Sequence, residues 1–447
     1  MPRILVRSHK NPFTVADAET TRASNLIGSN TGNLVFSQAV FRLLSTPNTR
    51  LKTSGVAKYK PSRINAGFDH VVIPLANAFR PGYTDTLDSL TAVIEQLKVP
   101  VTVVGVGAQA DLEGEQRGAD RVDPATKRFV SAVLERSPSI GVRGEFTRSY
   151  LRGLGFGDEH VKVIGCPSMF MYGPDLGIER KVDALTAESP IAFNVSPYVH
   201  AMGPISLDHA ARYPNLVYMG QNMQTLTLML DGIYPGKHAR MSKVGAPVTV
   251  NHPLIRENRV RFFLDPKTWF SHLAQYDFSF GTRIHGNIAA LLAGTPAVLL
   301  AHDSRTLELA DYHQIPHRVI DSLPANPDAA TLYAEADWSK LNDGHTARWG
   351  EFSDFLHQHD LTHVYDEGQD ASRFDDKLAQ TEFPPPVETL MGLPPEDLYA
   401  MKRKIDEQRE ELRKAAEDRK ALSRRLSSTP PTLQRRLKKK LRHILKR

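Results

Sequence analysis

Cationic side chains follow two apolar segments that lie close together in this chain. Arg283 and His285 come directly after residues 277–281, and Arg305 comes soon after residues 297–301. Arginine forks pair with carboxylate and phosphate oxygens through two parallel hydrogen bonds, and histidine is the usual general acid or base near neutral pH. These residue types therefore predict a small, strongly anionic ligand with proton transfer beside it.

Both segments have the pattern of a strand followed by a helix. Residues 277–281 have the pattern of a buried strand end, and residues 297–301 are a short apolar run. Residues 288–293 form an apolar helix segment that ends at Gly294. Ligands of open α/β sheets bind at the carboxyl ends of the strands, beside the helix N-termini. We therefore expect the two cationic turns to lie at one edge of a parallel sheet.

Strand and helix signals alternate through the first 330 residues, which predicts parallel sheets with helices on both faces. A polar, irregular stretch at residues 174–190 divides this pattern. We predict an α/β protein with two Rossmann-like domains that face a cleft. The predicted boundaries are 1–185 for the first domain, 186–365 for the second with its closing helices, 366–397 for a Pro-rich linker, 398–426 for a heptad helix and 432–447 for a basic amphipathic tail.

The composition is that of a globular protein, with 41% hydrophobic and 24% charged residues. No run of eighteen apolar residues occurs, so no transmembrane helix is expected. The single cysteine, Cys166, excludes an intrachain disulfide and a cysteine-built zinc site. The histidines show no metal-ligand spacing, so we expect no bound metal. These features favour a cytoplasmic location.

The C-terminal part of the chain has its own charge and periodicity. Residues 399–447 hold 18 Lys/Arg and 6 Asp/Glu, whereas the remaining residues hold 38 basic and 44 acidic groups. Eight Lys/Arg and a Leu/Ile face in residues 433–447 predict a helix on an anionic membrane surface, at the inner face of the membrane. A solvated, disordered end is the alternative, and nucleic acid is not an expected partner because the acidic body would oppose wider contact.

Apolar residues recur at alternating spacings of three and four across residues 398–426. This heptad seam predicts self-association into a homo-oligomer, because a lone amphipathic helix must bury its apolar stripe. Docking of the seam onto the body of the same chain is the alternative.

Several of these residues resemble the signature of the polysaccharide pyruvyl transferase family. Residues 281–286, Gly-Thr-Arg-Ile-His-Gly, are similar to its Arg-x-His block, together with Gly-Thr-Pro at 294–296. Residues 140–145 resemble its strand that ends in arginine, and residues 29–33 resemble its Asn-Gly turn. The resemblance extends over roughly residues 25–320 in order and spacing.

The resemblance implies two Rossmann-like domains arranged as in GT-B glycosyltransferases. It also implies transfer of the carboxyvinyl unit of phosphoenolpyruvate onto two hydroxyls of a sugar, which yields a pyruvate ketal and phosphate. No cofactor is implied, since phosphoenolpyruvate is the donor substrate, and the acceptor is a glycan or a lipid-linked sugar of a surface polysaccharide.

By position, the resemblance implies His285 and Arg143 as catalytic residues. The candidate substrate-binding residues are Arg283, Arg305, Asn33, Asn30, Ser304 and Glu308. Some family members carry lysine near position 305, where this chain has a forked guanidinium. We expect Glu308 either to orient Arg305 or to contact the acceptor.

Structural roles are the alternatives for these residues. Arg283 and Arg143 are alternatively ion-pair partners at strand ends. His285 is alternatively a helix cap or a packing residue, and Glu308 part of a solvated helix face. The alternative function is a GT-B glycosyltransferase that uses a nucleotide sugar, although no motif for a base or a ribose stands out. A non-catalytic protein that acts through its basic tail is a third class, against which the intact Arg/His set argues.

Overall fold

The computed structural model describes residues 1–110, 118–324 and 327–394, and then 396–397, 403, 406–407, 410–411, 413–415 and 417–418. It divides into two compact units, Met1–Met391 and Gly392–Arg447. The described residues from 403 to 418 are helical, but most of the predicted 398–426 seam and the whole 432–447 tail lie outside the described residues. No helix in the described part of the chain is both long and apolar enough to cross a membrane.

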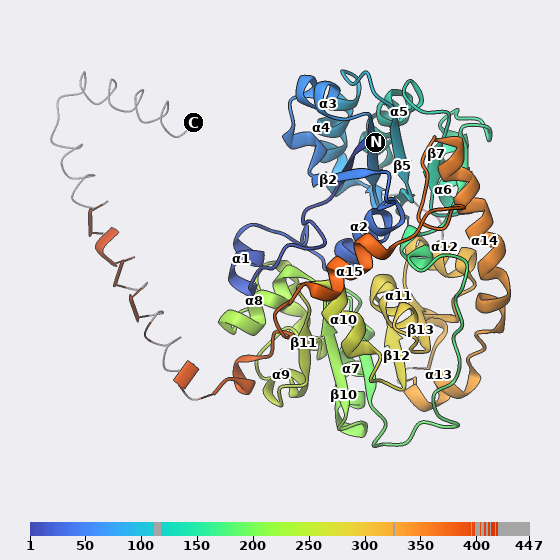
Figure 1. Ribbon diagram of the computed structural model, residues 1–447. Helices are drawn as coiled ribbons and strands as arrows, with labels where there is room; N and C mark the ends of the chain where they lie inside the picture. Colours follow the sequence, from blue (N-terminus) through green and yellow to red (C-terminus); the bar gives the residue numbers. More distant parts are fainter. Residues whose placement is uncertain are drawn as a thin grey trace. The chain divides into compact units, whose positions relative to one another are not determined.

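A parallel sheet forms the centre of the N-terminal half (Figure 1). Its four continuously paired strands are, in spatial order, β2 (Arg50–Ser54), β1 (Arg3–Arg7), β3 (His70–Pro74) and β5 (Val101–Val104). A bridge between Val106 and Val142 extends it to β7 (Ile140–Val142) and β8 (Val161–Val163). The order of the strands reverses between β1 and β3, and such a switch point is where α/β sheets bind ligands.

The central strands β3 and β5 are buried along their whole length, because helices cover both faces of this sheet. A short pair, β4 (Asn77–Phe79) with β6 (Gly107–Ala108), lies beyond the ends of β3 and β5. The helices of this half are α1 (Ala18–Ala23), α2 (Gly32–Leu43), η1 (Val56–Lys58), α3 (Pro61–Gly67), η2 (Pro81–Tyr83), α4 (Thr84–Ile94), α5 (Ala119–Leu134), α6 (Glu145–Gly153) and η3 (Pro167–Phe170).

The C-terminal half is a second parallel sheet of six strands. In spatial order these are β11 (Val260–Phe262), β10 (Leu216–Gly220), β9 (Ile191–Asn194), β12 (Phe278–Gly281), β13 (Ala297–Ala301) and β14 (His317–Val319). This is the Rossmann order, with its switch point between β9 and β12. Its helices are α7 (Met202–Arg212), α8 (Met223–Asp231), η4 (Lys237–Val244), α9 (Pro253–Arg256), α10 (Pro266–Leu273), α11 (Ile284–Leu292), α12 (Ser304–His313), η5 (Ile320–Ser322) and α13 (Ala329–Glu335). The predicted α/β class with two Rossmann-like halves is confirmed.

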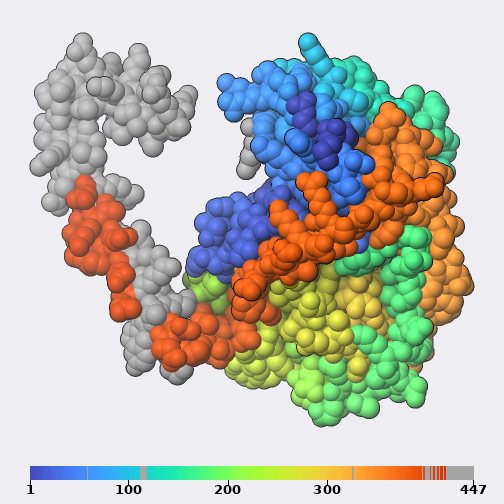
Figure 2. Space-filling view, viewed as in Figure 1, coloured from blue at the N-terminus to red at the C-terminus, as the bar shows by residue number. Residues whose placement is uncertain are grey.

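The chain then returns to the N-terminal half, through α14 (Ser339–Gln358) and α15 (Ser372–Gln380), before η6 (Leu390–Gly392). Phe352 of α14 is buried in the same core cluster as Ile4 of β1. The ring of Phe374 in α15 packs 5.1 Å from that of Phe13. Figure 2 shows this returning segment, in orange, across the surface between the blue and yellow parts.

Residues 366–391, expected to lie in a linker, are therefore part of the globular body. Asp375 forms a 2.7 Å ion pair with the buried Arg42, and Val387 pairs with Phe262 at the edge of the second sheet. Their proline content suggested an extended linker. The apolar and acidic side chains before and after the first run of prolines have partners on the surface of the body, which the sequence pattern did not reveal.

Candidate functional site

The switch points of both sheets open onto one cavity of about 310 Å³. The N-terminal half contributes Arg7, which ends β1, and the C-terminal half contributes Arg283, which follows β12. Five arginines line the cavity: Arg7, Arg80, Arg143, Arg283 and Arg305. No aspartate or glutamate is among the described residues that line it. The predicted cleft between the halves is thus an electropositive cavity suited to anions.

Arg283 is held by its backbone and leaves its charge uncompensated. Strand β12 ends at Gly281, whose φ of +141° and close approach to the Asn194 carbonyl oxygen require glycine. The Arg283 amide donates to Asn194 Oδ1 at 2.6 Å, and its side-chain Nε donates to the Val195 carbonyl at 3.1 Å. Among the described residues no carboxylate lies within ion-pair distance of its guanidinium. This geometry argues against the alternative of a structural ion pair.

His285 lies in the first turn of α11 and also lines the cavity. Its Nε2 lies 3.6 Å from the Cys166 thiol, and its ring meets that of Phe36 edge-on. A Cβ on Gly32 would lie 2.7 Å from the His285 Cβ, so the glycine of the Asn-Gly turn leaves room for this residue. The helix has no side-chain cap bond, which argues against the capping alternative.

The imidazole of His285 is neutral in the unliganded protein. Burial, followed by the positive charges of Arg143 and Arg305, lowers its pKa to about 3. Burial also raises the pKa of the Cys166 thiol, which is therefore protonated and close to Nε2. A neutral ring is able to accept a proton, which is the state that a general base requires.

Arg143 is a nearly fully buried cation, with 3% of its surface exposed. Its side chain crosses Gly107, where a Cβ would lie 2.1 Å from Nε. Nε has no hydrogen-bond partner among the described residues, and burial lowers the pKa of the guanidinium, an effect that Glu308 opposes. A buried cation without a full set of acceptors is costly alone, so an anionic ligand would stabilise it.

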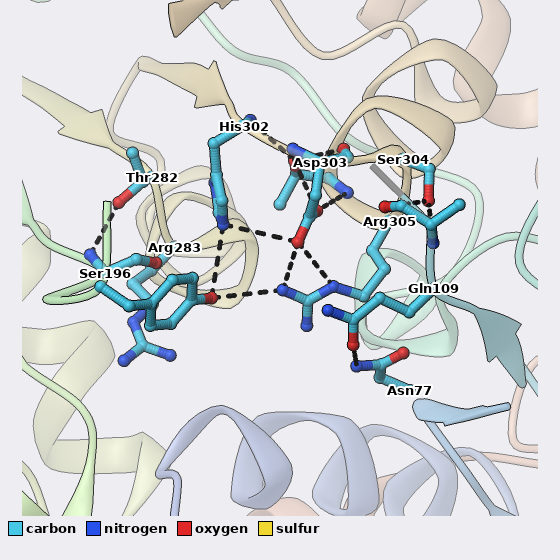
Figure 3. Close-up of polar contacts among 12 residues, drawn as sticks. Asn77, Gln109, Ser196, Thr282, Arg283, His302, Asp303, Ser304 and Arg305 are labelled. Atoms are coloured by element: carbon cyan, nitrogen blue, oxygen red, sulfur yellow. Dashed lines mark hydrogen bonds and ion pairs between the residues drawn. The ribbon is translucent and has the colours of Figure 1, made fainter. Parts of the chain in front are cut away.

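Arg305 differs from Arg283 because it already has a partner (Figure 3). Its Nε and an Nη group donate to Asp303 Oδ2 at 2.8 and 2.5 Å, and the same Nη group donates to the Tyr198 hydroxyl at 3.2 Å. Burial disfavours the charge of Arg305, but Asp303 and Tyr198 outweigh burial and raise its pKa. Its charge is therefore largely compensated by Asp303 before any ligand binds.

Asn30 and Asn33 line the cavity, but the contacts of their side chains build the loop itself. Asn33 Nδ2 donates to the carbonyls of Ile27 and Gly28 at 3.1 and 3.0 Å. Asn30 Oδ1 accepts from the Gly32 amide at 2.8 Å. Both residues thus shape the wall at the start of α2.

Ser304 and Glu308, by contrast, are not among the residues that line the cavity. Ser304 Oγ accepts from the Ala110 amide at 2.9 Å and donates to the Ala110 carbonyl at 3.0 Å. Glu308 is 7% exposed, and its carboxylate receives the amide and hydroxyl of Thr147, at 2.6 and 3.0 Å. The structure thus places both residues in hydrogen-bonded contacts that join α12 to the N-terminal half. Glu308 does not lie on a solvated face, and its hydrogen bonds go to Thr147 rather than to Arg305.

The contact between Glu308 and Thr147 is expected to be sensitive to pH. Burial raises the pKa of Glu308 from 4.5 to about 7, against the opposing effect of Arg143 and the Thr147 hydrogen bonds. Because this pKa is higher in the folded state, Glu308 in its protonated form contributes to the free energy of unfolding. This contribution is fully present below about pH 4.5 and is lost as the pH rises through about 7.

We therefore expect Glu308→Gln to gain stability over the wild type as the pH rises from 5 to 8, by on the order of 3 kcal/mol. The amide keeps one acceptor and one donor for Thr147 but has no charge. Thermal unfolding at several pH values measures the difference, and groups common to both proteins cancel. Equal pH slopes for the two proteins would contradict the expectation.

Sequence reasoning missed several cavity residues, above all Arg7, Arg80 and Tyr198. Arg7 directly follows an apolar run, which was an available signal. That signal points to the cavity only when β1 is known to lie beside β3. Local spacing in the sequence does not reveal the spatial order of the strands.

One cluster among the described residues brings histidine and aspartate atoms close enough together to suggest a metal site. His357, His363 and Asp366 each bring one ligand atom within 4.8 Å of the others. The Tyr365 amide donates to His363 Nδ1 at 3.2 Å, so Nε2 of the neutral ring carries the proton and faces Asp366 Oδ1 and Ser353 Oγ. A protonated Nε2 has no lone pair for a metal ion. We interpret the cluster as a hydrogen-bonded turn after α14.

Comparisons with known proteins identify the family of this chain. A family model described as polysaccharide pyruvyl transferase matches residues 30–304, which confirms the resemblance predicted from the signature residues. Comparison with curated proteins gives no match.

Among solved structures, the chain is similar at 12% identity to S. aureus MnaA in a co-structure with UDP, over 86% of this chain and 99% of that one, with a TM-score of 0.38. It is similar at 11% identity to Methanocaldococcus jannaschii UDP-GlcNAc 2-epimerase in complex with UDP-GlcNAc and UDP, over 80% and 99%, with a TM-score of 0.45. A third likeness, also at 11% identity, is to Anabaena Alr3699/HepE in complex with UDP and glucose, over 85% and 99%, with a TM-score of 0.39.

Proposed function

Because this chain belongs to the polysaccharide pyruvyl transferase family, a family of transferases, we propose that it transfers the carboxyvinyl group of phosphoenolpyruvate to a sugar. The acceptor is a surface polysaccharide or its precursor, and the product is a pyruvate ketal. The observation that carries the proposal is the pairing of an uncompensated Arg283 with a neutral His285 on one cavity wall.

The residues divide the chemistry between binding and proton transfer. Arg283 and Arg143 bind the carboxylate and phosphate of phosphoenolpyruvate, because both groups accept two-point hydrogen bonds from guanidinium forks. Arg305, fixed by Asp303, stabilises negative charge on the departing phosphate. Asn30 and Asn33 keep the wall in place beside His285.

The reaction proceeds in two steps. In the first, one sugar hydroxyl adds to the central carbon of phosphoenolpyruvate, and a proton adds to the methylene carbon to give a methyl group. In the second, the other hydroxyl bonds to the same carbon, the bond to phosphate breaks, and its proton leaves with the phosphate. His285 accepts the proton of an attacking hydroxyl, since its ring is neutral before substrate binds.

The test is phosphate release from phosphoenolpyruvate in the presence of a panel of free and lipid-linked glycans. Mass spectrometry of the glycan then detects the added carboxyethylidene group. Transfer of a sugar from a nucleotide sugar, with no consumption of phosphoenolpyruvate, would instead identify a GT-B glycosyltransferase.

Activity is expected to survive removal of divalent ions. Arginine side chains supply the positive charge that a phosphate leaving group needs, so the mechanism has no step that requires Mg²⁺ or Mn²⁺. We expect initial rates in excess EDTA to equal those in Mg²⁺ within twofold. A strict dependence on Mg²⁺ or Mn²⁺, restored by adding the ion back, would count against phosphoenolpyruvate as the donor.

A further inference from the structure

A second group of cations lies on the N-terminal side of the cavity, away from the signature residues. We propose that Arg7, Arg80 and Tyr83 form a subsite for a phosphate group carried by the sugar acceptor. This inference rests on the proposed function, because it assigns the second substrate of the same cavity.

Tyr83 holds the two guanidinium groups in place. The Arg7 side chain donates to the Tyr83 hydroxyl at 2.8 Å, and the Arg80 guanidinium lies 5.6 Å from the centroid of the same ring. Backbone carbonyls also hold both guanidinium groups. Arg7 donates to the Pro74 carbonyl at 3.3 Å, and the Nε of Arg80 donates to the Asn77 carbonyl at 3.0 Å. All three side chains line the cavity. This is a pre-organised pair of forks rather than two free surface arginines.

Among the described residues, no carboxylate compensates the charges of this pair. Neither guanidinium has a carboxylate within 4.0 Å among the described residues, whereas Arg305 has Asp303. Burial, followed by the charge of Arg305, lowers the pKa of Arg80. Arg80 and Arg305 are cations that repel one another, and an anion bound beside Arg80 reduces that repulsion.

The position in the fold separates this pair from the donor residues. Arg7 ends β1 and Pro74 ends β3, so the pair stands at the switch point of the first sheet. Arg283 follows β12 and thus stands at the switch point of the second sheet. Each open α/β sheet offers its own ligand site at such a point. A two-substrate enzyme has one site for each substrate.

The total charge also exceeds what the donor needs. Of the five arginines among the described lining residues, only Arg305 has a carboxylate, that of Asp303, within ion-pair distance, which leaves four guanidinium groups without an ion-pair partner. Phosphoenolpyruvate brings about three negative charges at neutral pH, from a carboxylate and a phosphate monoester. A phosphate or diphosphate on the acceptor supplies the remainder, and planar guanidinium forks match its oxygens.

Room for such an acceptor lies beyond Arg80. A neighbouring hollow of about 530 Å³ shares Arg80, Tyr198 and His302 with the cavity. An acceptor whose phosphate binds at Arg7 and Arg80 therefore has space for its sugar next to the donor. Nucleoside diphosphate sugars and lipid diphosphate sugars share this chemistry.

Calorimetric titration with inorganic pyrophosphate and with phosphoenolpyruvate tests the subsite without knowledge of the acceptor. We expect pyrophosphate to bind the full-length protein that is already saturated with phosphoenolpyruvate. Arg7→Ala and Arg80→Ala should each weaken pyrophosphate binding about 10- to 100-fold, the loss expected for a charge-assisted hydrogen-bonded contact. Affinity for phosphoenolpyruvate should change less than threefold.

Four further variants make the result specific. Arg50→Ala removes an exposed arginine at the start of β2 and should change neither affinity. Arg283→Ala should lose phosphoenolpyruvate and retain pyrophosphate. Arg7→Lys and Arg80→Lys, which keep the charge, guard against misfolding and should give intermediate affinities for pyrophosphate.

The outcomes separate the possibilities. Competition between the two probes for one site, or equal weakening of both by the Arg7 and Arg80 variants, would overturn the subsite. Absence of phosphoenolpyruvate binding, with pyrophosphate binding that still depends on Arg7 and Arg80, would overturn the proposed donor but keep the subsite. Uridine diphosphate and geranyl diphosphate, titrated in the same way, show whether a nucleoside or a lipid carries the phosphate.

Discussion

Replacement of His285 by alanine is expected to lower kcat by a factor of about 10² to 10⁴, the usual loss for a general acid–base group. The KM for phosphoenolpyruvate should change less, since Arg283 and Arg143 remain in place. His285→Asn, which keeps a hydrogen-bonding side chain but transfers no proton, should be as slow as alanine. Steady-state phosphate release at a saturating concentration of acceptor measures kcat and KM for both variants. A folded His285→Ala protein with near-wild-type kcat would remove His285 from the mechanism.

The pH dependence of the wild type gives a second measurement of the same residue. In the free protein the pKa of His285 is held at about 3, first by burial and then by Arg143 and Arg305. The kcat/KM for phosphoenolpyruvate reports the free enzyme, so it should show no loss from His285 as the pH falls from 7 to 5. Bound phosphoenolpyruvate places negative charge beside the ring and raises its pKa, so kcat should begin to fall at a higher pH than kcat/KM.

The residues that sequence reasoning located share a local origin. Arg283 and His285 belong to one short block in which a buried strand, a glycine at positive φ and an apolar helix follow one another. Such a block encodes its own geometry, so the positions of its side chains can be predicted from spacing alone. Arg143 was predicted because residues 140–145 resemble a strand of the family that ends in arginine, and in the structure it directly follows β7.

The residues that sequence reasoning misplaced depend on contacts between the two halves. Glu308 meets Thr147 and Ser304 meets Ala110, and each pair lies far apart in the sequence. Nothing in the spacing near Glu308 indicates that its carboxylate accepts hydrogen bonds at the buried N-terminus of a helix in the other half. The prediction that residues 366–397 form a linker failed in the same way for residues 366–391, because the partners of Phe374 are in the N-terminal half.

Replacement of Arg283 by alanine is expected to raise the KM for phosphoenolpyruvate by about 10² to 10³, since a charge-assisted fork in a desolvated site stabilises its anion by roughly 3 to 4 kcal/mol. Arg283→Lys keeps the charge but loses the two-point geometry, so its KM should lie between those of the wild type and the alanine variant. Arg318→Ala is a matched control, because this arginine is in β14 of the same sheet and does not line the cavity. Initial rates over a range of phosphoenolpyruvate concentrations measure all four proteins.

Stability measurements on these variants separate a binding arginine from a structural one. Arg283 has no carboxylate partner among the described residues, so its loss should change the free energy of unfolding by less than about 1 kcal/mol. Loss of Arg305 leaves the buried Asp303 without its partner, so Arg305→Ala should cost about 3 to 5 kcal/mol. Denaturant unfolding without substrate gives both values. A large loss of stability in Arg283→Ala, with an unchanged KM, would make Arg283 the structural residue and leave the anion to the other arginines of the cavity.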